Sequence, residues 1–217
     1  MLAAILLILA GVLLSTNAQA QLAVGARAGC GLTTFVQRDS RDNFNLGFQM
    51  GVIGEYAISE TFAIQSGLLF ATQGAWWKIG RRDDDIVYFK ESTNLNYFQL
   101  PINFQQRSEG KIKFLFQAGP YFGYALSGKV KSEVFLVDGR SIETNSKIDF
   151  GRGKNEIKAF DFGVGLGIGT LFNNFQIGMG YNRGLVNLAN DRRTMKSSSF
   201  TLTVTYLFYK TKFTKTK

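Results

Sequence analysis

The chain of 217 residues contains no histidine, a single cysteine and two prolines. Lipases, acyltransferases and proteases built on barrel folds generally need a histidine as general base or as part of a triad, so these activities are excluded. Histidine-based metal sites are excluded too, and Cys30 alone forms neither a thiolate cluster nor an intrachain disulfide. The sequence therefore predicts a protein that is not an enzyme and that holds no metal or cofactor.

Long apolar runs are also missing beyond residue 20, so no membrane helix is predicted in the rest of the chain. The N-terminus carries an apolar run over residues 2–14, followed by Ala18-Gln19-Ala20. The run is too short for a comfortable transmembrane anchor, whereas the A-x-A pattern is typical of signal-peptide cleavage. We predict a secretory signal peptide over residues 1–20. The remaining chain is then either a soluble exported protein or a membrane β-barrel.

The formal net charge is +9 and the isoelectric point is near 9.7, which raises the question of nucleic-acid binding. The cationic residues are spread over predicted loops, turns and the C-terminal tail, with no single basic face, so nucleic-acid binding is not predicted. Contact with anionic lipid head groups and lipopolysaccharide suits this charge better. The densest charged cluster, Arg81-Arg82-Asp83-Asp84-Asp85, is interpreted as a solvated loop, with a divalent cation or a lipopolysaccharide contact as the alternative.

Glycine and aromatic residues are abundant, with 24 Gly, 20 Phe and 8 Tyr. This composition favours twisted antiparallel strands over helices. Residues 160–169 have the sequence FDFGVGLGIG, in which large apolar residues alternate strictly with Asp161 and four glycines. A period of two places the apolar set on one face of a strand and the small residues on the other. Because a bare face is unsuited to water, we predict that it looks into a cramped interior and that the apolar face meets lipid.

The same alternation predicts eight strands, over residues 22–32, 44–56, 61–74, 95–106, 111–127, 160–170, 175–186 and 197–208. Their connections alternate between long loops (37–43, 76–94, 128–158 and 187–196) and short turns (57–60, 107–110 and 171–174), with a hairpin expected around Asp138-Gly139. Such asymmetry is typical of transmembrane barrels. We predict an all-β fold: an eight-stranded antiparallel up-and-down transmembrane β-barrel over residues 21–208, followed by a short basic extension over residues 209–217. An even strand number places both termini on the periplasmic side of a Gram-negative outer membrane.

Aromatic residues gather near the predicted strand ends in two rows, as in the interfacial girdles of membrane barrels. The expected loop-side row is Phe44, Phe70, Trp76, Trp77, Tyr97, Phe122, Tyr124 and Phe160. The expected turn-side row is Phe62, Phe104, Phe114, Phe172, Phe175 and Phe208.

The interior of an eight-stranded barrel is just wide enough for side chains to fill it. The predicted inward set combines many glycines with Arg27, Gln49, Glu55, Gln65, Gln117, Tyr121, Asp161, Gln176 and Asn182. Buried charges are tolerable only when they are paired and hydrogen-bonded, so we predict that Arg27 interacts with Glu55, Asp161 or both. We interpret this polar cluster as structural, with a gated polar path as the alternative.

Several segments resemble the PorT-like outer-membrane β-barrel proteins of Bacteroidetes. The resemblance rests on GEYAISETF at 54–62, YFQLPI at 97–102, AGPYFGY at 118–124 and YNRGLVN at 181–187. The C-terminal Tyr206-Leu207-Phe208 resembles the aromatic end signal that the barrel-insertion machinery reads. The resemblance covers nearly all of the chain beyond residue 20 and implies fold and location. It implies no catalytic residue, and only its name-giving member is tied to protein secretion.

Three functions remain open at this point. The first is an integral outer-membrane barrel with a structural or interaction role, whose loops 76–94 and 128–158 form the contact surface. The second is a narrow passive pore or an accessory component of a secretion system. The third is a soluble periplasmic barrel that binds an apolar ligand, as lipocalins do, with its large apolar face turned inward.

Overall fold

The computed structural model describes residues 21–36, 43–79, 86–136, 140–151, 153, 156–190 and 194–210. The predicted signal peptide, the charged cluster at 81–85 and most of the C-terminal extension lie outside these residues. The chain forms the strands β1 (Gln21–Val36), β2 (Asn43–Ala57), β3 (Phe62–Ile79), β4 (Ile86–Arg107), β5 (Ile112–Leu136), β6 (Ser141–Lys147), β7 (Phe160–Phe172), β8 (Phe175–Gly184) and β9 (Lys196–Lys210). Within the described part, no helix is long and apolar enough to cross a membrane.

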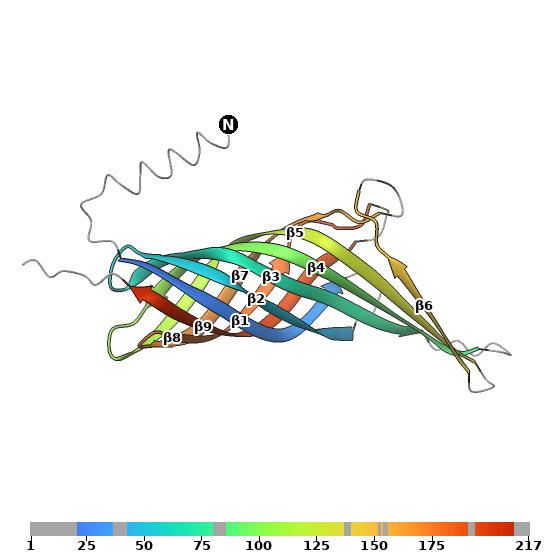
Figure 1. Cartoon of the computed structure of the whole chain (residues 1–217), viewed down its shortest axis with the longest axis horizontal. Coiled ribbons are helices and arrows are strands. Elements are labelled where there is room, and N and C mark those ends of the chain that lie inside the picture. Colours follow the sequence, from blue (N-terminus) through green and yellow to red (C-terminus); the bar gives the residue numbers. More distant parts are fainter. Residues whose placement is uncertain are drawn as a thin grey trace, which may run out of the picture.

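Eight of these strands close into a barrel (Figure 1). Their order is β4-β3-β2-β1-β9-β8-β7-β5, and the pairing of β4 with β5 closes the ring. Every pairing around the ring is antiparallel. β1 begins and β9 ends at the same end of the barrel (Figure 1). The predicted eight-stranded antiparallel barrel is therefore confirmed.

The large apolar side chains point outward, as the alternation predicts. On β7, Leu166 is 57% exposed and Ile168 is 54% exposed, whereas Asp161 is 1% exposed. The other ring strands carry the same exposed apolar row, for example Met50 and Val52 on β2. A lipocalin-like barrel needs its large apolar face inside, so the third function is wrong for this fold.

The glycine row of β7 makes room for larger side chains that enter the lumen from neighbouring strands. A Cβ atom at Gly163 would lie 2.5 Å from the ring of Tyr121 and 2.3 Å from the backbone oxygen of Arg183. At Gly165 and Gly167 it would meet the side chains of Asn182 and Gln117. The bare face of this strand is thus a steric requirement of the filled interior.

Gly163→Ala is expected to lower the free energy of unfolding by about 1–3 kcal/mol, because a backbone oxygen cannot yield as a flexible side chain does. Gly54→Ala is the matched control, since the nearest atom to its added Cβ is 4.0 Å away. The control is expected to stay within about 0.5 kcal/mol of the parent or to be more stable. Urea unfolding in lipid vesicles measures both; equal stability of the two variants would contradict the packing described here.

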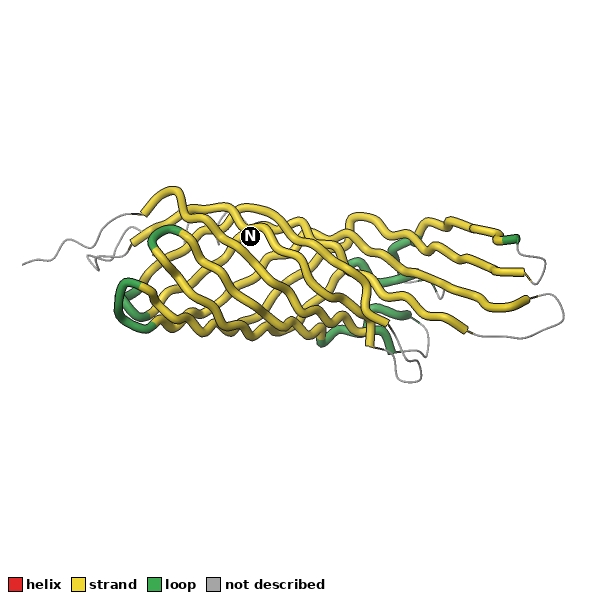
Figure 2. The backbone as a smooth tube through the Cα atoms, turned by 90° about the horizontal axis from the view of Figure 1, so that it is seen from below, coloured by secondary structure: helices red, strands yellow, loops and turns green. Residues whose placement is uncertain are grey.

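A sheet protrudes from the barrel at the end opposite to the start of β1 (Figure 2). It consists of residues 76–79 of β3, 86–94 of β4, 129–136 of β5 and all of β6, and we call it the protruding sheet. β6 pairs with β5 alone and lies outside the ring, so the hairpin expected around Asp138-Gly139 exists, although its tip lies outside the described residues. The prediction that 76–94 and 128–158 are long loops is wrong for residues 76–79, 86–94, 129–136 and, apart from the expected hairpin, 141–147, which are strand.

The sequence predicts these strands too short because only the parts that lie within the barrel face lipid. Beyond the barrel both strand faces meet water, so polar and apolar residues mix, as in Tyr88-Phe89-Lys90-Glu91. The backbone nevertheless continues its hydrogen-bonded ladder from β3 through β4 and β5 to β6. The ladder, and not an apolar face, keeps these residues extended.

The short turns lie close to their predicted positions, although β4 extends to Arg107 and β7 to Phe172. The aromatic rows need two corrections, because Trp76 and Trp77 lie in the protruding sheet and Tyr97 points inward. Asn173 in the β7–β8 turn and Gly110 in the β4–β5 turn adopt positive φ values of 52° and 115°. Phe175 and Tyr206 pack 4.8 Å apart at the turn side, and Phe122 and Phe162 pack 5.2 Å apart toward the loop side. Tyr97 does not belong to the girdle, because its side chain is buried in the lumen.

Candidate functional site

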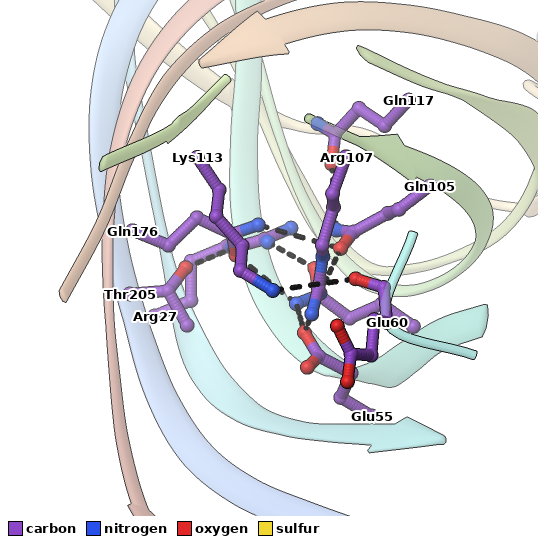
Figure 3. Close-up of polar contacts among 10 residues, drawn as sticks. Arg27, Glu55, Glu60, Gln105, Arg107, Lys113, Gln117, Gln176 and Thr205 are labelled. Atoms are coloured by element: carbon purple, nitrogen blue, oxygen red, sulfur yellow. Dashed lines mark hydrogen bonds and ion pairs between the residues drawn. The ribbon is translucent and has the colours of Figure 1, made fainter. Parts of the chain in front are cut away.

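The lumen near the turn end holds a continuous polar network (Figure 3). Arg27 on β1 donates hydrogen bonds to Thr205 Oγ1 at 2.9 Å and to the side-chain oxygen of Gln65. Gln65 in turn donates to Glu55 Oε2 at 3.0 Å and to Gln176 Oε1 at 3.1 Å. This part of the network links β1, β2, β3, β8 and β9 across the barrel interior.

Arg107 and Gln105 on β4 complete the network. The guanidinium of Arg107 forms an ion pair with Glu55 at 2.5 Å and donates to Gln105 Oε1. Gln105 donates to Gln117 Oε1 on β5 at 3.2 Å. We call the following set the lumen network: Arg27, Glu55, Gln65, Gln105, Arg107, Gln117, Gln176 and Thr205. It contains two cations and one anion, all deeply buried.

Arg27, Glu55 and Asp161 all lie inside the barrel, with exposed fractions of 6%, 4% and 1%. The direct pairing that the sequence predicts for Arg27 is not present. Arg27 reaches Glu55 only through Gln65, and the carboxylate of Glu55 is taken by Arg107. Arg27 has no contact with Asp161 in the described part of the chain.

Three members of the lumen network were missed in the sequence: Gln105, Thr205 and one charged residue, Arg107, which was assigned to the turn 107–110. β4 extends to Arg107, and strand alternation then points its side chain inward together with Gln105. Phe104 points outward, so continuing the alternation along β4 places Gln106 outward and Arg107 inward. The correction gives Glu55 a partner closer than Arg27.

Asp161 belongs to a second polar layer, toward the protruding sheet. Its Oδ2 atom accepts hydrogen bonds from Ser197 Oγ at 2.6 Å and from Tyr121 Oη at 3.2 Å. Ser197 and Thr205, which contact Asp161 and Arg27 respectively, are eight positions apart on β9. At about 3.3 Å per residue this separation is about 26 Å along the strand, which is too far for Arg27 and Asp161 to meet.

An apolar cluster closes the lumen above this layer. Phe35, Leu95 and Leu188 are fully buried in it, and they pack with Ala75, Tyr97, Ala125 and Met195. Leu188 and Met195 come from the segment 187–196, which the sequence predicts to be a polar loop. Leu188 and Met195 instead form part of a lid, and Ile148, Phe150 and Ile157 pack against the cluster from the segment that precedes β7.

Little space remains between these layers. A cavity of about 40 Å³ lies in the middle of the lumen beside Arg27, Gln49, Gln99 and Tyr121. It has room for a few water molecules only. A hollow of about 240 Å³ opens at the turn end, and its lining includes Glu55, Arg107, Lys111 and Lys113. The described residues include no group of three or more potential metal ligands.

The comparison with family models identifies one match, to the model described as "Outer membrane protein beta-barrel domain", over residues 17–190. No curated protein matches the chain.

The comparison with solved structures matches the chain, at low identity, to proteins that include the following three. Ail, the attachment invasion locus protein of Yersinia pestis, was solved in complex with the heparin analogue sucrose octasulfate; it is 14% identical, with a TM-score of 0.41 over 87% of this chain and 99% of that chain. Neisserial surface protein A is 14% identical, with a TM-score of 0.40 over 85% and 97%. The translocator domain of the autotransporter NalP from Neisseria meningitidis is 10% identical, with a TM-score of 0.21 over 95% of each chain.

Proposed function

Since the chain belongs to the family of the outer membrane protein beta-barrel domain, we propose that it is an integral outer-membrane protein of a Gram-negative bacterium with a closed lumen. Its role is to support the membrane or to bind a partner, and it does not include catalysis. Within the broader family, the PorT-like proteins are the group that its sequence motifs support. Residues 1–20 are a secretory signal peptide that is removed on export.

The filled lumen is the observation that carries this proposal. The apolar lid, the Asp161 layer and the lumen network succeed one another along the axis, and the central cavity measures only about 40 Å³. A porin leaves an aqueous channel, whereas an eight-stranded barrel is filled by its side chains. These layers argue against a passive pore as the function. An accessory role in secretion stays compatible with a closed barrel that presents a surface.

The protruding sheet is the surface that this protein presents. Short turns lie at one end of the barrel and the long hairpins at the other (Figure 1). Membrane barrels of bacteria carry their short turns in the periplasm. Both termini are then periplasmic, the insertion machinery reads the C-terminal strand from that side, and the protruding sheet stands outside the cell.

Fractionation and protease accessibility test this proposal together. The protein is expected in the outer-membrane fraction, to be extracted only by detergent, and to migrate faster on gels before heating than after. Protease added to intact cells is expected to cut within the protruding sheet and to leave the barrel whole. Recovery from the soluble periplasmic fraction, or protection of the sheet in intact cells combined with cleavage after the outer membrane is opened, would contradict it.

A further inference from the structure

The outer face of the protruding sheet carries lysines that oppose one another directly. Lys78 on β3 pairs in register with Lys90 on β4, and Lys129 on β5 pairs in register with Lys147 on β6. Like charges directly opposite each other on an antiparallel pair are destabilising. Lys90 has a counter-charge in Glu133 at 3.8 Å. A fold that keeps both pairs on one surface therefore gains most from an anion that lies between Lys129 and Lys147.

These lysines share one face because the register is regular. One cross-strand row contains Lys78, Lys90, Glu133 and Glu143, and the next contains Trp76, Ser92, Lys131 and Asn145. Residues two positions apart point to the same side of a strand. This surface therefore carries five lysines (78, 90, 129, 131 and 147) and two glutamates (133 and 143). Among the described residues, Lys129 and Lys147 have no ion-pair partner.

A hollow of about 520 Å³ lies on this face. Its walls are Asn45, Trp76, Lys90, Ser92, Lys131 and Glu133. Trp76 is held by a hydrogen bond from its indole nitrogen to the backbone oxygen of Phe44, and Lys90 lies 5.7 Å from the ring. Hydrogen bonds to Glu133 and Glu143 raise the pKa of Lys131 above its ordinary value. The hollow combines hydroxyl and amide groups with two cations, which share the one carboxylate of Glu133.

The height of this face above the lipid-facing part of the barrel indicates which kind of ligand can reach it. Even-numbered residues of β4 point outward, so Lys90 and Ser92 lie on the same wall as the lipid-facing Phe98. A tilted barrel strand advances about 2.5 Å along the axis per residue. Lys90 thus stands about 20 Å beyond Phe98, and Lys129, opposite Asn94, about 10 Å beyond it. A phospholipid head-group layer extends only about 5–8 Å from the hydrocarbon core.

We propose that the outer face of the protruding sheet binds the phosphate-bearing sugars of a glycolipid in the outer leaflet, with Lys78, Lys90, Lys129 and Lys147 as the phosphate ligands. A head group of several phosphorylated sugars reaches the height at which these lysines stand, and a phospholipid head group does not. The inference rests on the proposed outer-membrane location, because only then does this wall face the outer leaflet.

Binding of lipopolysaccharide to the purified full-length protein in detergent tests the site. Lys129→Gln together with Lys147→Gln is expected to weaken binding about 30-fold, and the addition of Lys78→Gln and Lys90→Gln to weaken it further. Lys111→Gln with Lys113→Gln, which neutralises two lysines at the turn end, is the matched control and is expected to change binding less than about twofold. Equal binding by the parent and the four-lysine variant would overturn the proposal.

Two further probes fix the chemistry of the ligand. Removing the phosphates from lipopolysaccharide is expected to weaken its binding to the parent protein. The loss should be at least as large as the loss that the four-lysine variant shows with intact lipopolysaccharide. Vesicles of phosphatidylglycerol are expected to bind the parent and this variant equally. Displacement of lipopolysaccharide by millimolar inorganic phosphate, or a preference for phosphatidylglycerol, would overturn the assignment to a glycolipid.

A labelling experiment separates failure of the site from failure of the proposed orientation. Thr144→Cys, in a Cys30→Ser background, is expected to react with a membrane-impermeant maleimide on intact cells. A protected cysteine would contradict the outward orientation and, with it, the cellular role of the site, while the binding measured on the purified protein would be unaffected. Labelling together with unchanged binding by the lysine variants would contradict the site alone.

Discussion

Replacing Glu55 by Gln is expected to lower the free energy of unfolding by about 3–5 kcal/mol, the largest effect of any single conservative change in the lumen. Glu55 is the one anion of the lumen network, and it faces Arg107 directly and Arg27 through Gln65. The substitution keeps the size and much of the hydrogen bonding of the side chain. It leaves two buried guanidinium groups with no counter-charge in the lumen network. Urea unfolding in lipid vesicles, followed by tryptophan fluorescence, measures the loss.

Three companion variants make this prediction specific. Arg107→Gln is expected to cost less, about 1–3 kcal/mol, because Glu55 then keeps its link to Arg27. The double variant is expected to recover part of the loss of Glu55→Gln, since one uncompensated cation is gone. Glu143→Gln removes an exposed ion pair with Lys131 and is expected to cost at most about 1 kcal/mol. A loss below about 1 kcal/mol for Glu55→Gln would mean that water screens the network.

Replacing Leu166 by Arg is expected to cost about 2–4 kcal/mol in a lipid bilayer. Leu166 lies on β7 midway between Phe160 and Phe172, and it is 57% exposed on the outer face. At this depth a guanidinium would sit near the middle of the hydrocarbon core, where the penalty for a charge is greatest. Folding yield in lipid vesicles and urea unfolding of the inserted protein both measure the effect.

Ile142→Arg is the control for this depth effect. Ile142 on β6 is 54% exposed, nearly as much as Leu166, but it lies on the protruding sheet outside the ring. Its replacement is expected to change stability by no more than about 0.5 kcal/mol. Equal costs at the two positions would contradict the placement of the lipid belt on the ring strands.

The barrel was predictable because one physical rule acts on every ring strand. The stretch 160–169 shows it best, since lipid outside and crowding inside dictate large apolar and small residues in strict alternation. The protruding sheet obeys no such rule. In Tyr88–Ser92 neither face meets lipid, so the strand depends on its neighbours for hydrogen bonds and leaves no periodic signal.

The candidate site was predictable in part of its residues, without Arg107, and not in its pairing. Arg27, Glu55 and Asp161 are few enough, and phased clearly enough, to be placed in the lumen from the sequence. Which of them meet depends on height along the barrel, and height depends on strand registers that a single sequence does not contain. Leu188 and Met195 illustrate the same limit, because isolated apolar residues in a polar segment do not reveal that they close the lumen.

The closed lumen is the centre of this account, and single-channel recording in a planar bilayer tests it most directly. The purified protein is expected to insert without producing discrete conductance steps, because the lid, the Asp161 layer and the lumen network leave a cavity of only about 40 Å³. Insertion is verified independently by heat-modifiable mobility of the reconstituted protein. Stable, repeated conductance steps from the inserted parent protein would contradict the account and restore the pore as its function.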